Sequence, residues 1–272
     1  MKPAPFRYHR PQSLAQALTL LAEENDAKLI AGGQSLAPMM NMRLAQPAAL
    51  IDLNDITGLD GIAEKDGSLE VGALVRHQSL ADSARVKEVC PLLAEAARTI
   101  GHYAIRSRGT LGGSLAHADP AAQLPLVAAT LDAEIQAAGP RGGRRVRARE
   151  FFVSLMTTVL EPDEIVVSAR FAKAQPGERY AYLQFSRRSG DFAIVAVACV
   201  VRGKTLTLGL GGVEDKPVVL EGLAAAQKPE TIARQARETV QPVETPRVPA
   251  LLRKELVEVL VKRAIAKCTN SN

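Results

Sequence analysis

Cysteine and histidine are scarce in this sequence of 272 residues, and their spacing gives no metal-ligand set. Cys90, Cys199 and Cys268 are separated by about 110 and 70 residues and form no C-x-x-C pair. Neither a disulfide framework nor a zinc or iron–sulfur site can be drawn from them. The four histidines are expected to be surface or structural residues: His9, His77, His102 and His117. Any metal centre in this system is therefore expected on another chain.

Long apolar runs are also missing. Hydrophobic residues make up 47% of the chain, yet no uninterrupted run approaches the roughly 20 residues that a membrane helix needs. The N-terminus has two early prolines and scattered charge where a secretory leader would carry an apolar core. The sequence therefore predicts a cytoplasmic protein without a membrane span, and its length suffices for about two domains.

The net charge of +5 would suit a nucleic-acid-binding protein, but aromatic residues are only 4% of the chain, which weakens that interpretation. The densest basic stretch, "RGGRRVRAR" at 141–149, has no interleaved aromatic residue on which a base could stack. A glycine pair between two alternating stretches is typical of a tight β-turn. The stretch is therefore expected to be a solvated hairpin that turns at Gly142-Gly143, with a partner-docking edge as the second possibility and no nucleic-acid partner.

The remaining pattern mixes helices and strands without regular βαβ alternation, which favours an α+β fold. Ser13 caps an expected amphipathic helix, and Asp66-Gly67 marks an antiparallel hairpin within 61–74. Further predicted elements are a strand at 49–56, helices at 77–86, 90–101, 228–240 and 248–268, a helix opened by Pro120, and about three strands after residue 179 with a turn at Gly203-Lys204. The stretch 173–179, with its proline, glycine and charges, is the expected linker between domains.

Two loops share one form: an apolar residue, a glycine pair, then a hydroxyl or amide side chain. They are "AGGQS" at 31–35 and "TLGGS" at 110–114. Glycine lets successive backbone N–H groups point into a concavity where phosphate oxygens bind. A single Gly-Gly pair is more often an ordinary turn. Brought together, the two loops would suit the two phosphates of a dinucleotide, and neither loop matches a Walker A or a Rossmann fingerprint.

A third stretch, "SRRSGDFAIVA" at 186–196, places Asp191 and Phe192 beside two arginines at the entrance of an expected strand. An exposed aromatic ring there could cover one face of a planar ligand. A Phe192 that simply packs in the core is an equally good interpretation of this stretch alone.

Taken together, four stretches resemble the FAD-binding, medium-sized subunit of the molybdenum hydroxylases, a family that includes bacterial carbon monoxide dehydrogenase, xanthine dehydrogenases and N-heterocycle or aryl-CoA dehydrogenases. The resemblance rests on "AGGQSLAPMMNMRLAQPAALIDL", "IRSRGTLGGSLAHADPAAQLP", "FF...T.L.PDEIV" at 151–166 and "RRSGDFA", in the expected order over nearly the whole chain. It implies a two-lobed FAD domain of the vanillyl-alcohol oxidase type at 1–175, with lobes at about 1–55 and 56–175. A small C-terminal domain of antiparallel sheet plus helices follows at 176–272.

The resemblance also implies which residues hold FAD. The first loop would contribute Leu29, Ile30, Ala31, Gly32, Gly33, Gln34, Ser35 and Leu36, and the second Thr110, Leu111, Gly112, Gly113 and Ser114. Asp119 and Gln123 would continue toward the ribitol and adenosine part, while Val166 and Phe192 would pack on the flavin. Ile100, His117 and Asp191 complete the expected set. No histidine lies in the first loop, so the FAD is expected to be non-covalent.

This chain departs from many relatives in its second loop. Ala104 and Ser107 stand where an amide pair is usual, and Gln123 stands where an acidic residue is usual. An amide can still accept a hydrogen bond from a ribose hydroxyl, although without charge. FAD binding is expected to survive these changes.

The function that the resemblance implies is electron transfer. A large subunit with a molybdenum cofactor would hydroxylate substrate, two [2Fe-2S] clusters on a small subunit would relay electrons, and this chain's FAD would collect them for an external acceptor. The expected assembly is a dimer of heterotrimers, and no general acid, base or nucleophile is assigned to this chain. Two alternatives stay open: a self-sufficient flavin oxidase or reductase that uses His102, Tyr103 or His117, and a nucleotide-binding assembly module without redox activity.

Overall fold

The N-terminal lobe is a small parallel sheet covered by helices. A computed structural model describes residues 1–270. The strands, in the order β1-β3-β2, are β1 (Arg7–His9), β3 (Ala49–Asp52) and β2 (Ala27–Ile30). Helix α1 (Leu14–Glu23) begins at Ser13, whose side chain accepts from the Gln16 N–H as expected of an N-cap. Helix α2 (Leu36–Asn41) follows the first glycine loop.

The middle lobe is an antiparallel five-stranded sheet with a helical layer. Its order is β4 (Ile62–Lys65), β5 (Ser68–Gly72), β10 (Ile165–Ala172), β6 (Glu134–Gly139) and β7 (Gly142–Arg147). Its helices are α3 (His77–Asp82), α4 (Ala84–Val89), α5 (Pro91–Arg98), α6 (Tyr103–Arg106), α7 (Leu111–His117), α8 (Gln123–Leu131) and α9 (Ala148–Phe151). A short hairpin joins β8 (Phe152–Ser154) to β9 (Thr157–Thr158).

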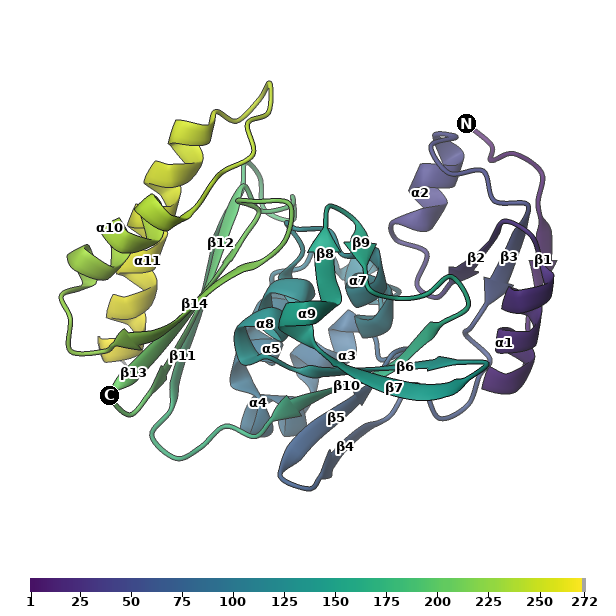
Figure 1. Ribbon diagram of the computed structural model, residues 1–272, viewed down its shortest axis with the longest axis horizontal. Coiled ribbons are helices and arrows are strands. Elements are labelled where there is room, and N and C mark those ends of the chain that lie inside the picture. Colours follow the sequence, from purple (N-terminus) through teal and green to yellow (C-terminus); the bar gives the residue numbers. More distant parts are fainter. Residues whose placement is uncertain (271–272) are drawn as a thin grey trace.

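The C-terminal part is an antiparallel sheet in sequence order: β11 (Arg179–Phe185), β12 (Val195–Arg202), β13 (Thr205–Gly211) and β14 (Val218–Ala224). Helices α10 (Pro229–Thr239) and α11 (Ala250–Asn270) cover one face of this sheet (Figure 1). The opposite side meets α5 and α8 of the middle lobe. The predicted α+β fold, a two-lobed FAD-type domain followed by an antiparallel sheet with helices, is confirmed.

Helix α8 packs unusually close to the C-terminal sheet, and all nine of its residues are buried. Two glycines of β13 make this approach possible. A Cβ on Gly209 would lie 1.8 Å from the Thr130 hydroxyl oxygen, and one on Gly211 would lie 2.9 Å from a Leu126 methyl carbon. One hydrophobic core therefore extends from the middle lobe into β11 and β12.

Several expected elements differ in detail. The predicted helix at 77–86 is two helices, because Ser83 leaves the helical conformation and caps α4 with its side chain. Pro120 does not open a helix: Ala118 adopts a left-handed φ of 51°, and α8 begins only at Gln123. The basic hairpin turns at Pro140-Arg141 rather than at the glycine pair, since Gly139 pairs with Gly142. The hairpin β8–β9 and the strand β14 were not predicted.

Candidate functional site

A cavity of about 680 Å³ lies where the two lobes meet the loop that connects β11 to β12. Every residue of the predicted cofactor set lines it except Leu111, which is fully buried in the core. The chain thus gathers into one cavity residues that are more than 160 positions apart, from Leu29 to Phe192.

The first glycine loop presents hydrogen-bond donors that the protein itself does not use. It connects the end of β2 to α2, and Gly33 has a φ of +68°, which favours glycine. Within residues 1–270, no protein acceptor receives the backbone N–H groups of five consecutive residues: Gly32, Gly33, Gln34, Ser35 and Leu36. Since all five residues line the cavity, these donors fit an anionic oxygen bound there.

The second glycine loop has the opposite character, because its N–H groups are engaged within the fold. The Leu111 and Gly112 N–H groups donate to the carbonyls of Val75 and Ala73, at 3.0 and 2.8 Å. The Thr110 hydroxyl oxygen caps α7 and accepts from the Gly113 N–H at 3.2 Å. This loop is therefore anchored to the sheet, and what it offers a ligand is chiefly its side-chain hydroxyls.

The first loop touches the residues that lead into the second. A Cβ on Gly32 would lie 2.2 Å from the Arg108 carbonyl oxygen and 2.7 Å from the Gly109 Cα. A Cβ on Gly112 would lie 2.5 Å from the Ala73 Cβ. These glycines are required by close contact between protein backbones, which is a different reason from the ligand approach expected from the sequence.

His77 is a buried residue of the site that the sequence did not single out. Its Nε2 lies 2.9 Å from the Thr110 carbonyl oxygen and 3.1 Å from the Ser114 hydroxyl oxygen. A carbonyl only accepts, so Nε2 carries the hydrogen, and the Ser114 hydroxyl is left to donate elsewhere. Burial lowers the pKa of His77 to about 4, so the ring is neutral near pH 7. The expectation of a structural histidine holds here, although His77 also lines the cavity.

The far end of the cavity is formed where the C-terminal sheet joins it. Gln123 is buried, and its Nε2 donates to the Gln184 Oε1 at 3.1 Å. The same oxygen accepts from the Tyr182 hydroxyl at 2.9 Å, while the Thr99 hydroxyl donates to the Ala96 carbonyl at 2.8 Å. Two donors on one oxygen fix the amide of Gln184, and the bond from its Nε2 leaves the Gln123 carbonyl oxygen as the acceptor available to a ligand.

Other predicted residues hold varied positions around this end. Asp119 accepts from the Ala121 N–H at 2.8 Å, and Val166 and Ile100 are buried in the cavity wall. Phe192 is 60% exposed, so the alternative that it packs in the core is wrong. The neighbouring Arg187 does not line the cavity and instead donates to the Arg247 carbonyl at 2.7 Å.

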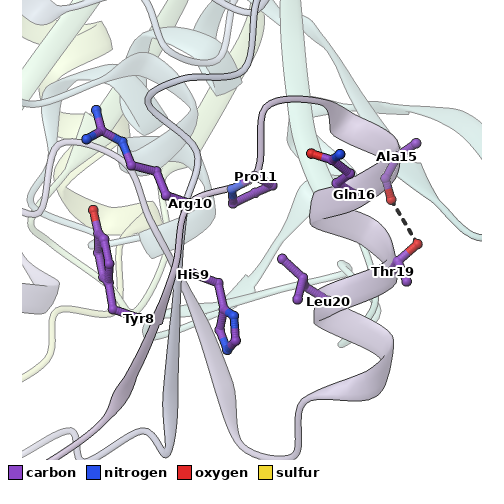
Figure 2. A pocket seen from close by; sticks show the side chains of 8 residues that line it. All are labelled: Tyr8, His9, Arg10, Pro11, Ala15, Gln16, Thr19 and Leu20. Carbon is purple, nitrogen blue, oxygen red and sulfur yellow. Dashed lines mark hydrogen bonds between the residues drawn. The ribbon is translucent and has the colours of Figure 1, made fainter.

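A second hollow lies between β1 and α1, and Figure 2 shows its lining. It contains none of the predicted site residues. Its polar groups are occupied within the lobe: the Thr19 hydroxyl donates to the Ala15 carbonyl at 3.1 Å, and Arg10 pairs with Asp55 at 2.6 Å. This hollow offers a ligand much less than the cavity between the loops.

The basic hairpin is neutralised by its own protein. Each of its five arginines has an acidic partner within 4.0 Å: Arg141 with Asp163, Arg144 with Glu164, Arg145 with Glu134, Arg147 with Asp132, and Arg149 with Asp132 and Glu221. It forms the charged edge strand β7, which discourages edge-to-edge pairing. The predicted hairpin is confirmed.

The structure adds little on metals and membranes. The described residues contain no cluster of three or more histidine, cysteine or acidic side chains that could hold a metal ion. All three cysteines are buried as free thiols. None of the helices described in 1–270 is long and apolar enough to cross a membrane.

The fold and the cavity define a two-lobed flavin-nucleotide-binding protein with a C-terminal antiparallel sheet. Residues 4–171 match the family model described as the FAD binding domain in molybdopterin dehydrogenase, and residues 180–268 match the CO dehydrogenase flavoprotein C-terminal domain. The chain belongs to this family of FAD-binding medium subunits of molybdenum hydroxylases, as the resemblance implied, and it is an oxidoreductase subunit.

Individual relatives are similar to this chain over nearly their full lengths. The chain is 37% identical to the 6-hydroxypseudooxynicotine dehydrogenase complex subunit alpha of Paenarthrobacter nicotinovorans, covering 98% of this chain and 95% of that protein. It is 35% identical to the carbon monoxide dehydrogenase medium chain of Afipia carboxidovorans, covering 98% of each. Its structure matches a chain of carbon monoxide dehydrogenase from Hydrogenophaga pseudoflava with a TM-score of 0.94 and 35% identity, covering 99% of both chains.

Proposed function

We propose that this chain carries FAD as the electron-transfer subunit of a multi-subunit molybdenum hydroxylase. The observation that carries the proposal is the row of unengaged N–H donors on the first loop, whose residues line the same cavity as the second loop. When bound, FAD accepts electrons and passes them to an acceptor, so the chain's own task is to bind, orient and shield the cofactor.

The proposed roles follow from the groups that each residue presents. The N–H groups of residues 32–36 would bind phosphate oxygens, assisted by the hydroxyl of Ser114. The carbonyl oxygen of Gln123, oriented by Gln184, would accept from a hydroxyl of the sugar part. Phe192 would cover the flavin ring from the cavity mouth. The remaining lining residues of the predicted set would complete the non-covalent site.

The proposed partners are a large subunit with the molybdenum cofactor and a small subunit with [2Fe-2S] clusters, assembled as a dimer of heterotrimers. The names of the relatives support this, because they describe medium chains and one subunit alpha of a complex. We further propose that the chain has two domains, at 1–175 and 176–272, of which the last two residues lie beyond the described part. The two family matches support this boundary, because one ends at residue 171 and the other begins at residue 180. The cytoplasmic location stays a prediction from the sequence.

Purification of the chain from its native host tests this function. We expect one FAD per chain, two further polypeptides, and molybdenum and iron in the same fraction. The flavin absorbance should bleach when a substrate of the complex is added, with carbon monoxide, purines, N-heterocycles and aromatic thioesters as the panel.

The alternatives give different results in the same experiment. Bleaching of the isolated chain by an organic substrate would indicate a self-sufficient flavoenzyme. A colourless chain without partners would contradict the proposal and favour an assembly module.

A further inference from the structure

Two side chains behind the glycine loops tie one loop to the other. The Arg76 Nη1 donates to the Arg108 carbonyl oxygen at 2.6 Å, two residues before the second loop begins at Thr110. The Arg76 Nη2 donates to the Asn54 Oδ1 at 2.7 Å. The Asn54 Nδ2 in turn donates to the carbonyl oxygen of Ala31, in the first loop, at 2.9 Å. Neither Arg76 nor Asn54 lines the cavity, so both act on a ligand through the loops.

The amide of Asn54 is held in one orientation. Its backbone N–H donates to the Asp52 Oδ1 at 3.0 Å, and its Nδ2 lies 2.5 Å from the same oxygen. A flipped amide would direct its NH₂ at the guanidinium of Arg76 and its oxygen at the Ala31 carbonyl, so both contacts would be repulsive. Asp52 is itself buried and accepts from the Tyr8 hydroxyl, which makes the support rigid.

Arg76 brings a positive charge that has no carboxylate in direct contact with it. Among the described residues, no acidic side chain lies within 4.0 Å of its guanidinium, although Asp52 and Asp60 act on it from farther away. Burial and the neighbouring Arg108 lower the pKa of Arg76, yet an arginine stays charged at any working pH. A cation directly behind both loops favours an anion between them.

We propose that Arg76 and Asn54 form one positioning pair that fixes the separation of the two glycine loops and so favours ligands whose pyrophosphate spans both. The inference rests on the proposed FAD site. It depends on the fork of the guanidinium, because separate nitrogens reach the Arg108 carbonyl and the Asn54 amide. A lysine has one nitrogen and would replace only part of the bridge.

The test compares FAD with riboflavin, which has the isoalloxazine and ribityl parts but no phosphate. The full chain, freed of flavin, is titrated with each compound and the dissociation constant is read from flavin fluorescence. Arg76→Met is expected to weaken FAD about ten- to hundredfold and riboflavin less than about twofold, with Arg76→Lys in between. Asn54→Ala should weaken FAD binding similarly. The loss of FAD affinity in the double variant should be far smaller than the sum of the two single losses, because both residues serve one bridge.

Arg10→Met is the matched control, since Arg10 lies in the N-terminal lobe with Asn54 and pairs with Asp55 without contacting either loop. Equal weakening of FAD and riboflavin, or no weakening, would overturn the positioning pair while leaving the proposed function intact. A wild-type chain that does not bind FAD would overturn the proposed function instead. Should Arg76→Met not fold, Arg76→Lys and Asn54→Ala carry the same comparison.

Discussion

The two glycine loops look alike in sequence and do different work in the structure. In the first loop, five successive N–H groups have no acceptor within the described protein. In the second, the N–H groups of residues 111–113 are used to dock the loop on the sheet and to cap α7. The first loop therefore carries the donors available to a ligand, and the second is an anchored loop that lines the same cavity.

The comparison shows that one glycine signature can have two physical causes. Gly33 is needed for a left-handed backbone conformation, whereas Gly32 and Gly112 are needed because another backbone lies where a side chain would be. Because the unengaged N–H donors lie on the first loop, substitutions there should change ligand binding more than stability. Substitutions in the second should change stability first.

Gly32→Ala should have the largest effect. The new Cβ would lie 2.2 Å from the Arg108 carbonyl oxygen, and backbone cannot move aside cheaply. Overpacking of this kind costs about 3 kcal/mol at its upper end, or about a hundredfold in FAD affinity if the loops separate. Flavin stoichiometry and fluorescence titration measure the loss, and hydrogen exchange in β12 and α11 should show the C-terminal sheet still folded. Gly61→Ala, where a Cβ meets nothing within 4 Å, is the control. Stoichiometric FAD in Gly32→Ala would contradict the proposed role of the first loop in binding FAD.

Gly112→Ala should lower stability by about 2 kcal/mol, because its Cβ would lie 2.5 Å from that of Ala73. Chemical denaturation of the flavin-free chain measures the change. We expect the affinity of the folded fraction for FAD to fall less than in Gly32→Ala. The comparison between the loops fails if Gly112→Ala loses FAD at unchanged stability.

Acid should loosen the second loop through His77. Its pKa is about 4 in the folded chain against 6.5 ordinarily, so the unfolded state binds the proton more readily. The stability that neutral His77 preserves is complete above about pH 6.5 and is lost as the pH falls toward 4, amounting to about 2 kcal/mol between pH 7.5 and 5. The free energy of unfolding is measured for the wild type and for His77→Gln between pH 7.5 and 5. The loss of stability on acidification should be larger in the wild type by about 2 kcal/mol. Parallel curves would exclude His77 as the source.

Thr110→Val should have the smallest effect. It removes the N-cap of α7, which typically costs about 1 kcal/mol. Thermal unfolding should show the loss, and Thr110→Ser should restore most of it because serine is an equally good cap. An equal loss in Thr110→Ser would assign the effect to packing of the threonine methyl group instead.

Local signals predicted much of the fold. Ser13 marked the start of α1, and Asp66-Gly67 marked the β4–β5 hairpin, where both residues have positive φ values. These features depend on neighbours in sequence. The break at Ser83 was not predicted because the apolar pattern continues through it.

The candidate site was predicted by resemblance, but its supports were not. The contact of Gly32 with Arg108 and the bridge from Arg76 to Asn54 join segments distant in sequence. His77 gives no motif, since its role depends on burial beside Thr110. Such contacts follow from the tertiary arrangement, which spacing along one sequence does not specify.

The absence of side chains at Gly209 and Gly211 of β13 constrains which C-terminal sheets could replace the one in this protein. Helix α8 begins with Gln123 in the cavity wall and runs against those two glycines. A C-terminal sheet transplanted from a relative with larger residues there would push the helix outward and displace Gln123. The two halves are thus matched parts, and a working chimaera needs glycine at both positions of the donor strand.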